Sequence, residues 1–154
     1  MQAIEYLNQV KRLDALIDNK REEERELWAM ATSMTQNSDG MPHGTSEPDK
    51  MTNIIQKIIT ARERTNAAID KYVDTKQDII KHIEMLPQRQ YEVLHWLYIK
   101  KRDKITKGQS WYYKWSEVAE KMGCTEQNIG KLRGKALKNL QKILDSEEKT
   151  EKVD

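Results

Sequence analysis

The chain has 154 residues, which suits one domain or two small ones. Charged residues make up 34% of it, glycine and proline are scarce and phenylalanine is absent, a composition that argues against a β-sandwich or barrel and favours long helices. No apolar run approaches the roughly 18 residues of a membrane span, the first ten residues lack the features of a signal peptide, and Cys124, the one cysteine, excludes an intrachain disulfide. We therefore expect an all-α cytoplasmic protein that binds no membrane.

The N-terminal part of the sequence, residues 1–86, predicts a long antiparallel helical hairpin. Over about residues 3–35 and about 50–85, residues recur at alternating spacings of three and four, as they do along the line of contact between paired helices. We call each such line of residues a seam. Residues 36–49, with two prolines, two glycines and His43, predict the loop between the helices. The first seam is Ala3, Tyr6, Val10, Leu13, Ile17, Lys20, Glu24, Leu27, Ala31 and Met34. The second is Met51, Ile55, Ile58, Arg62, Thr65, Ile69, Tyr72, Lys76, Ile79, Ile83 and Leu86.

Polar residues interrupt both seams at one level of this predicted hairpin. Two helices joined by a loop fold back on each other, so the numbers of facing residues should sum to about 85. This rule predicts a Glu24–Arg62 pair, with Lys20 opposite Thr65.

The apolar stripes are wider than a two-helix seam requires. Because large uncovered apolar surfaces mark interfaces, the extra residues predict a homodimer formed through the hairpin. These flanking residues are Leu7, Leu16, Trp28, Ile54, Ile59 and Ile80.

Charge is distributed unevenly along the chain. Residues 87–144 carry 13 Lys and Arg against 5 Asp and Glu, a net charge of +8, whereas residues 1–86 and 145–154 each carry −3. A concentrated basic segment is typical of proteins that bind polyanions. The acidic residues 145–154 are expected to be a disordered tail.

Leu86-Pro87 predicts a boundary, because proline favours the first turn of a new helix, which here should run to about Lys100. Residues 100–115 form a basic segment that ends in four aromatic residues within five positions. Two interpretations are open: basic and aromatic side chains grip phosphate and sugar, or Trp111 and Trp115 dock on the core while the lysines remain in water.

Residues 116–144 predict two helices joined by a tight turn. Ser116 is the expected N-cap of the first helix, and Ala119 allows the helices to approach closely. Gly123 supplies the positive φ of the turn. Thr125 caps the second helix, which buries Ile129 and Leu132. This spacing is typical of a helix-turn-helix.

If Ile129 and Leu132 face inward, the opposite face of the second helix is available for double-stranded DNA. The N-terminal end of such a helix reads base edges. Glutamine pairs with adenine, glutamate accepts from cytosine, and lysine reaches guanine or phosphate. The predicted base-reading residues are Thr125, Glu126, Gln127 and Lys131, and the predicted phosphate contacts are Arg133, Lys135, Lys138, Lys104, Lys107 and Lys114.

Three stretches resemble region 4 of sigma-70-type factors, which reads the −35 promoter element. They are Leu86-Pro87-Gln88-Arg89-Gln90-Tyr91, Trp115-Ser116-Glu117-Val118-Ala119-Glu120-Lys121-Met122-Gly123-Cys124-Thr125, and Lys135-Ala136-Leu137-Lys138-Asn139-Leu140. The whole chain looks like small sigma-like proteins of phages and prophages, grouped with late-gene regulators of the ArpU type. The resemblance implies a DNA-binding transcription regulator of phage or prophage genes. Its hairpin would dimerise or contact bacterial RNA polymerase.

An enzyme is not expected. The three histidines lie in separate elements, and no nucleophile elbow, phosphate loop or metal-ligand spacing occurs, so neither a cofactor nor a metal is predicted. The alternative function is a phage assembly or packaging protein such as a small terminase subunit, which also joins a helix-turn-helix to long helices. A dimer would favour the regulator, and a ring of eight or more copies would favour the terminase.

Overall fold

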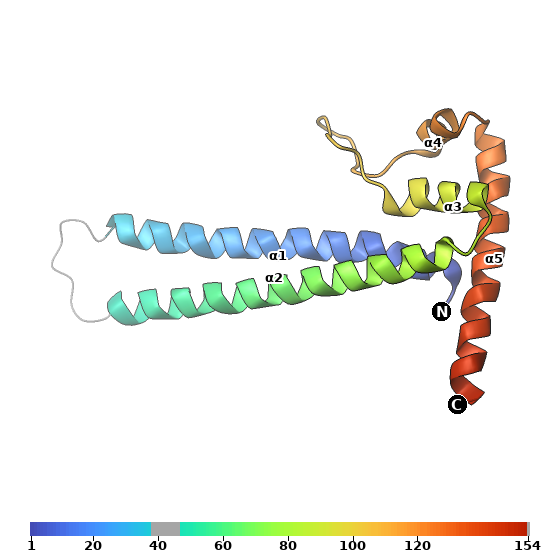
Figure 1. Cartoon of the computed structure of the whole chain (residues 1–154). Helices are drawn as coiled ribbons and strands as arrows, with labels where there is room; N and C mark the ends of the chain where they lie inside the picture. Colours follow the sequence, from blue (N-terminus) through green and yellow to red (C-terminus); the bar gives the residue numbers. More distant parts are fainter. Residues whose placement is uncertain (38–46, 154) are drawn as a thin grey trace. The chain divides into compact units, whose positions relative to one another are not determined.

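The computed structural model describes residues 1–37 and 47–153 and confirms the prediction of an all-α fold (Figure 1). Most of the predicted loop, including His43, lies outside the described residues. No helix in the described ranges is both long and apolar enough to cross a membrane. The elements are α1 (Ala3–Asn37), α2 (Glu47–Ile83), α3 (Gln88–Leu94), the π-helical segment η1 (His95–Ile99), α4 (Trp115–Met122) and α5 (Glu126–Val153).

The chain divides into two compact units, and the division does not follow the boundary expected at Leu86-Pro87. The terminal unit comprises residues 1–12 and 74–154, and the middle unit comprises residues 13–73. Both long helices contribute to both units. The reason is that the first turns of α1 and the last turns of α2 bury their apolar residues in the same unit as α3, α4 and α5.

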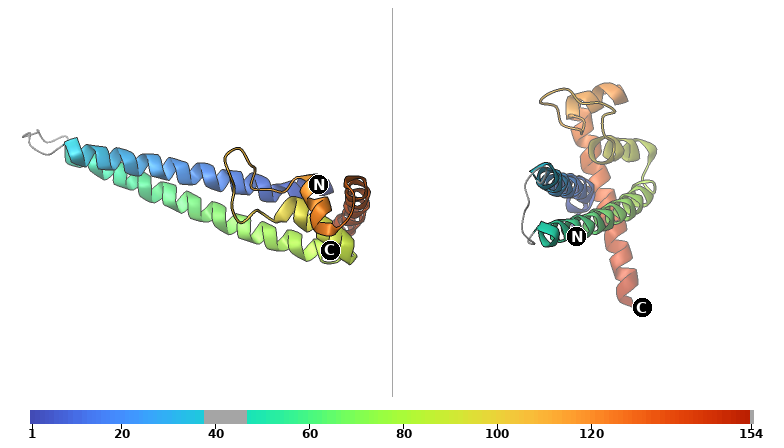
Figure 2. Two further views of the ribbon diagram at one scale, coloured as in Figure 1. Left: turned by 90° about the horizontal axis from the view of Figure 1, so that it is seen from above. Right: turned by 90° about the vertical axis from the view of Figure 1, so that its left-hand side faces the viewer.

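In the middle unit, α1 and α2 run antiparallel side by side (Figures 1 and 2). Ala31, Ile54 and Ile58 form a buried cluster between them. The Nε of Arg62 donates to Oε1 of Glu24 at 3.1 Å, so the predicted pair is confirmed. The second seam differs at two levels: Ile54 is buried whereas Ile55 is 49% exposed, and Ala68 is buried whereas Ile69 is half-buried.

Every element of the terminal unit contributes buried apolar side chains. Leu7 of α1 and Ile79 and Ile83 of α2 are fully buried, as are Val93 of α3 and Leu140 of α5. Helices α3 and α4 both pack on α5.

The expected helix after Pro87 begins at Gln88 and changes form before it ends. Pro87, at φ −54° and ψ 150°, stands just outside the first turn. The last turn is a π-helix, in which the backbone N–H of Lys100 donates to the carbonyl of His95 at 2.8 Å. This wider turn accompanies the burial of Leu97, Tyr98 and Ile99.

The prediction of a disordered tail is wrong. Helix α5 continues through residues 145–153. Its second half is held by residues distant in sequence: the backbone N–H of Ala3 donates to Oε1 of Gln141 at 2.7 Å, and the ring of His82 meets Glu147. Acidic composition alone did not reveal these partners.

Candidate nucleic-acid interface

Helices α4 and α5 are joined by the three residues Gly123, Cys124 and Thr125. Gly123 adopts the left-handed conformation, with φ 67° and ψ 37°, as the sequence predicted. The N–H of Cys124 donates to the carbonyl of Ala119 at 2.9 Å, which closes the C-terminal end of α4. The hydroxyl oxygen of Thr125 accepts from the N–H of Asn128 at 3.2 Å, so Thr125 caps α5.

The start of α4 differs from the prediction. Its N-cap is Lys114, not Ser116, and Trp115 is its first residue. The side chain of Glu117 accepts from the backbone N–H of Lys114 at 3.2 Å. The carboxylate of Glu117, one turn into the helix, therefore satisfies the backbone N–H of the N-cap residue, which is the reciprocal half of a capping box.

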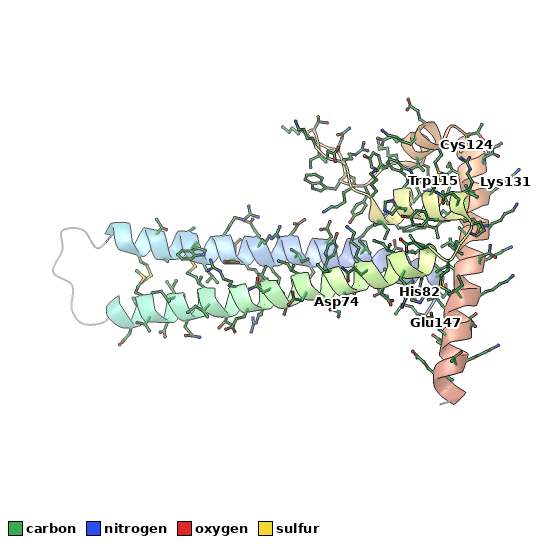
Figure 3. The ribbon with its side chains drawn as sticks, in the orientation of Figure 1. Asp74, His82, Trp115, Cys124, Lys131 and Glu147 are labelled. Carbon is green, nitrogen blue, oxygen red and sulfur yellow. The ribbon has the colours of Figure 1, made fainter. Side chains whose placement is uncertain are left out.

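One face of the α4–α5 pair is buried and the other is open. Val118, Ala119 and Ile129 are buried, and Ala136 and Leu140 continue the buried stripe along α5. Six of the predicted DNA contacts are exposed on α5 or in the turn before it: Thr125, Glu126, Gln127, Lys131, Lys135 and Lys138. The labelled Lys131 points away from α4 (Figure 3).

Arg133, a predicted phosphate contact, also makes contacts within the terminal unit. Its Nε donates to the hydroxyl oxygen of Tyr98 at 2.8 Å, and its guanidinium lies 5.3 Å from the centre of the Trp115 ring. A Cβ added to Gly130 would lie 3.5 Å from the same ring. Trp115 therefore lies over α5, although it remains 43% exposed.

The basic loop, residues 100–114, is closed at its base. Lys101 and Tyr112 form an antiparallel β-bridge, and the N–H of Arg102 donates to the carbonyl of Trp111 at 2.7 Å. The turn at the tip contains Gly108 at φ 86°. The basic loop is thus closed into a short hairpin.

Arg102 fastens this hairpin to α4. Both of its terminal nitrogens donate to the carboxylate of Glu117, and its Nε donates to the carbonyl of Ser110 at 2.9 Å. The hydrogen bonds from Arg102 hold the pKa of Glu117 below its ordinary value. Glu117 therefore both caps α4 and anchors the loop.

The predicted contacts Lys104, Lys107 and Lys114 are all exposed. The basic loop extends away from α5, on the side opposite the one toward which Lys131 points (Figures 1 and 3). The structure therefore does not bring Lys104 and Lys107 together with the exposed lysines of α5.

Several basic and aromatic side chains near the loop contact one another within the terminal unit. The ammonium of Lys11 lies 4.8 Å from the centre of the Tyr112 ring and 5.2 Å from that of Tyr98. Burial, together with the charge of Arg133, lowers the pKa of Lys11. Trp111, which was one candidate for docking on the core, is 41% exposed, and Lys101 lies 5.6 Å from the centre of its ring. The role of Lys11 was not predictable, because nothing in its surroundings along the chain distinguishes it.

A cluster around His82 joins α1, α2 and α5 (Figure 3). Its Nε2 lies 2.6 Å from Oε2 of Glu147, and its Nδ1 lies 2.7 Å from the carbonyl of Asp78 and 2.8 Å from the hydroxyl of Tyr6. Burial opposes protonation of the ring, but the contacts with Glu147 and Asp78 outweigh it and raise the pKa of His82. No group of three or more His, Cys, Asp or Glu side chains in the described ranges is placed to hold a metal ion.

Comparison with known proteins adds no relative: no family model, no curated protein and no solved structure matches the chain.

Proposed function

We propose that the protein is a sequence-specific DNA-binding regulator of phage or prophage transcription, and that the N-terminal end of α5 enters the major groove. The observation that carries this proposal is the asymmetry of α5: Ile129 is buried, while Glu126, Gln127 and Lys131 are exposed directly after a tight turn. A major groove about 12 Å wide admits one helix, and the first turns of that helix face the base edges.

The exposed side chains suit distinct contacts. The amide of Gln127 can pair with adenine through two hydrogen bonds, and the carboxylate of Glu126 can accept from the amino group of cytosine. Lys131 reaches guanine or phosphate. Lys135 and Lys138 lie further along α5, where contacts with phosphates would hold the helix in the groove.

Charge and resemblance support the same proposal. Residues 87–144 carry a net charge of +8, which favours association with a polyanion. The resemblance to region 4 of sigma-70-type factors supplies the regulatory context and makes bacterial RNA polymerase a second proposed partner.

The first experiment tests base reading. Selection of bound fragments from a library of phage and host DNA should yield a preferred site, and fluorescence anisotropy then measures affinity for it. Gln127→Ala should lose about 1–3 kcal/mol on that site and relax the preference at one base pair. Gln77→Ala, at an exposed position on α2, is the matched control. Unchanged affinity and preference in Gln127→Ala would contradict the proposal.

The second experiment tests the direction from which DNA approaches. Lys135→Ala should weaken binding to all sequences alike and lower the slope of log affinity against log salt by about one. Lys104→Ala should leave that slope unchanged, because the basic loop extends away from α5. An effect at Lys104 but none at Lys135 would place the DNA on the opposite side.

A further inference from the structure

One face of the middle unit carries a groove with large apolar side chains. Trp28 of α1 is 49% exposed, and beside it on α2 Ile55 is 49% and Ile59 46% exposed. Together with Ile58 these residues line a groove of about 300 Å³. A second hollow of about 310 Å³ also has Trp28 in its wall and is otherwise lined by residues of α1, including Arg21 and Arg25. Trp28 therefore projects between two hollows.

Charged residues of both signs line the two hollows: Arg21, Glu24 and Arg25 on α1, and Arg62 and Glu63 on α2. Glu24 and Arg62 pair with each other across the hairpin. Beyond that pair, the charges that this face presents are positive on α1, at Arg21 and Arg25, and negative on α2, at Glu63.

We infer that this face binds the same face of a second copy of the chain. Exposed apolar groups of this size mark interfaces, and tryptophan is the most frequent anchor in them. Residues 13–73 carry 8 Lys and Arg against 11 Asp and Glu, so this unit would repel a nucleic acid. A surface that is complementary to itself is what a two-fold dimer requires.

The register of the hairpin specifies how the copies meet. A two-fold axis parallel to the helices places α1 of each copy against α2 of the other. Residues that lie at the same height along the hairpin then face each other across the interface. Arg62 pairs with Glu24, so residue numbers at one level sum to about 86. Glu63 of the second copy then lies between Arg21 and Arg25. Trp28 lies at the level of residue 58, over the apolar residues of the second α2.

The other face-to-face arrangement lacks this complementarity. A two-fold axis perpendicular to the helices sets α1 against α1 and α2 against α2, so Arg21 and Arg25 of one copy do not face Glu63 of the other. Opposite charges that face each other across an interface favour the arrangement that brings them together. The signs of the rim charges therefore favour the axis parallel to the helices.

Sedimentation equilibrium of the full chain tests the inference at concentrations up to tens of micromolar. We expect a dimer whose dissociation constant rises about tenfold or more in Trp28→Ala. Met30→Ala is the matched control: Met30 is 54% exposed but points to the other side of α1, so its removal should leave the dimer unchanged. A monomer throughout this range, or a ring of more than two copies, would overturn the inference.

Charge reversal tests the pairing itself. Glu63→Arg alone, and Arg21→Glu with Arg25→Glu, should each weaken the dimer about tenfold, and the combination of all three should restore it. Circular dichroism of every variant separates lost association from lost folding. Failure of the combined variant to recover would refute the proposed axis. No DNA enters either measurement, so the outcome is independent of the proposed function.

Discussion

The imidazole of His82 links folding to pH. Burial lowers the pKa of His82, but the hydrogen bonds with Glu147 and with the backbone of Asp78, together with the charges of both carboxylates, raise it by more. The pKa in the folded chain therefore lies above the ordinary 6.5. Protonation is therefore more favourable in the folded chain than in the unfolded chain. The resulting stabilisation is complete below about pH 6.5 and is lost as the pH rises through the folded pKa.

We expect the melting temperature of the wild type to fall, relative to His82→Gln, as the pH is raised above 6.5. His95 provides a control of opposite sign. Burial, together with the charges of Lys100 and Lys76, lowers the pKa of His95, so its contribution is present above pH 6.5 and is lost as the pH falls. His95→Gln should therefore remove the part of the fall in melting temperature below pH 6.5 that comes from His95. A pH profile of His82→Gln parallel to that of the wild type would contradict the assignment.

Single residues were predictable where a local rule or a shared level determines the partner. Glu24 and Arg62 were paired correctly because the loop position sets the register of two helices. The contacts of Arg133 with Tyr98 and Trp115 were not predictable, because these partners come from other elements. Basic charge in a sequence does not reveal which aromatic rings the fold brings close.

At the scale of elements, two glycines should respond oppositely to substitution. Gly134 lies inside α5, and a Cβ added there meets nothing within 4 Å. Gly134→Ala should therefore raise the free energy of unfolding by about 0.5–1 kcal/mol, because alanine favours the helix. Gly123 has φ +67°, so Gly123→Ala should lower it by about 1 kcal/mol or more. Urea denaturation measures both effects, and stabilisation by Gly123→Ala would contradict the role of the turn.

Boundaries set by local chemistry agree with the sequence, and those set by distant contacts do not. Pro87, Gly123 and Thr125 act through their own backbone or a neighbouring N–H, and all three lie where the sequence placed a boundary. The cap at Lys114 and the extension of α5 depend instead on Glu117 and Glu147, which are held by Arg102 and His82. No local rule identifies those partners.

At the scale of the whole molecule, the region with the DNA-binding signature is not self-sufficient. Leu7, Val10, Ile79 and Ile83 are fully buried in the terminal unit but lie outside residues 87–154. Burial of each such side chain contributes about 1.5–3 kcal/mol, so their combined loss of about 6–12 kcal/mol approaches the whole stability of a typical domain. The fragment 87–154 should therefore lack cooperative unfolding and show poorly dispersed amide resonances.

A second shortened variant shows whether the fragment fails to fold because it lacks core residues or only because it is shorter. Residues 12 and 74 lie at one level of the hairpin, so a short turn can replace residues 13–73 and leave the terminal unit complete. This variant should melt cooperatively. A well-dispersed, cooperatively folded 87–154 fragment would show that the first turns of α1 and the last turns of α2 are dispensable.

The division into units has a consequence for synthesis on the ribosome. The first turns of α1 emerge early, yet residues they bond, such as Asp78 and Gln141, emerge about 70 to 140 residues later. At about 5–20 residues per second this interval is on the order of ten seconds. During it, the first turns of α1 lack the partners that α5 supplies, such as Gln141, while α1 and α2 of the middle unit can already pair. The nascent chain should therefore assemble from its middle outward and expose its N-terminal apolar residues to chaperones until the last helix is made.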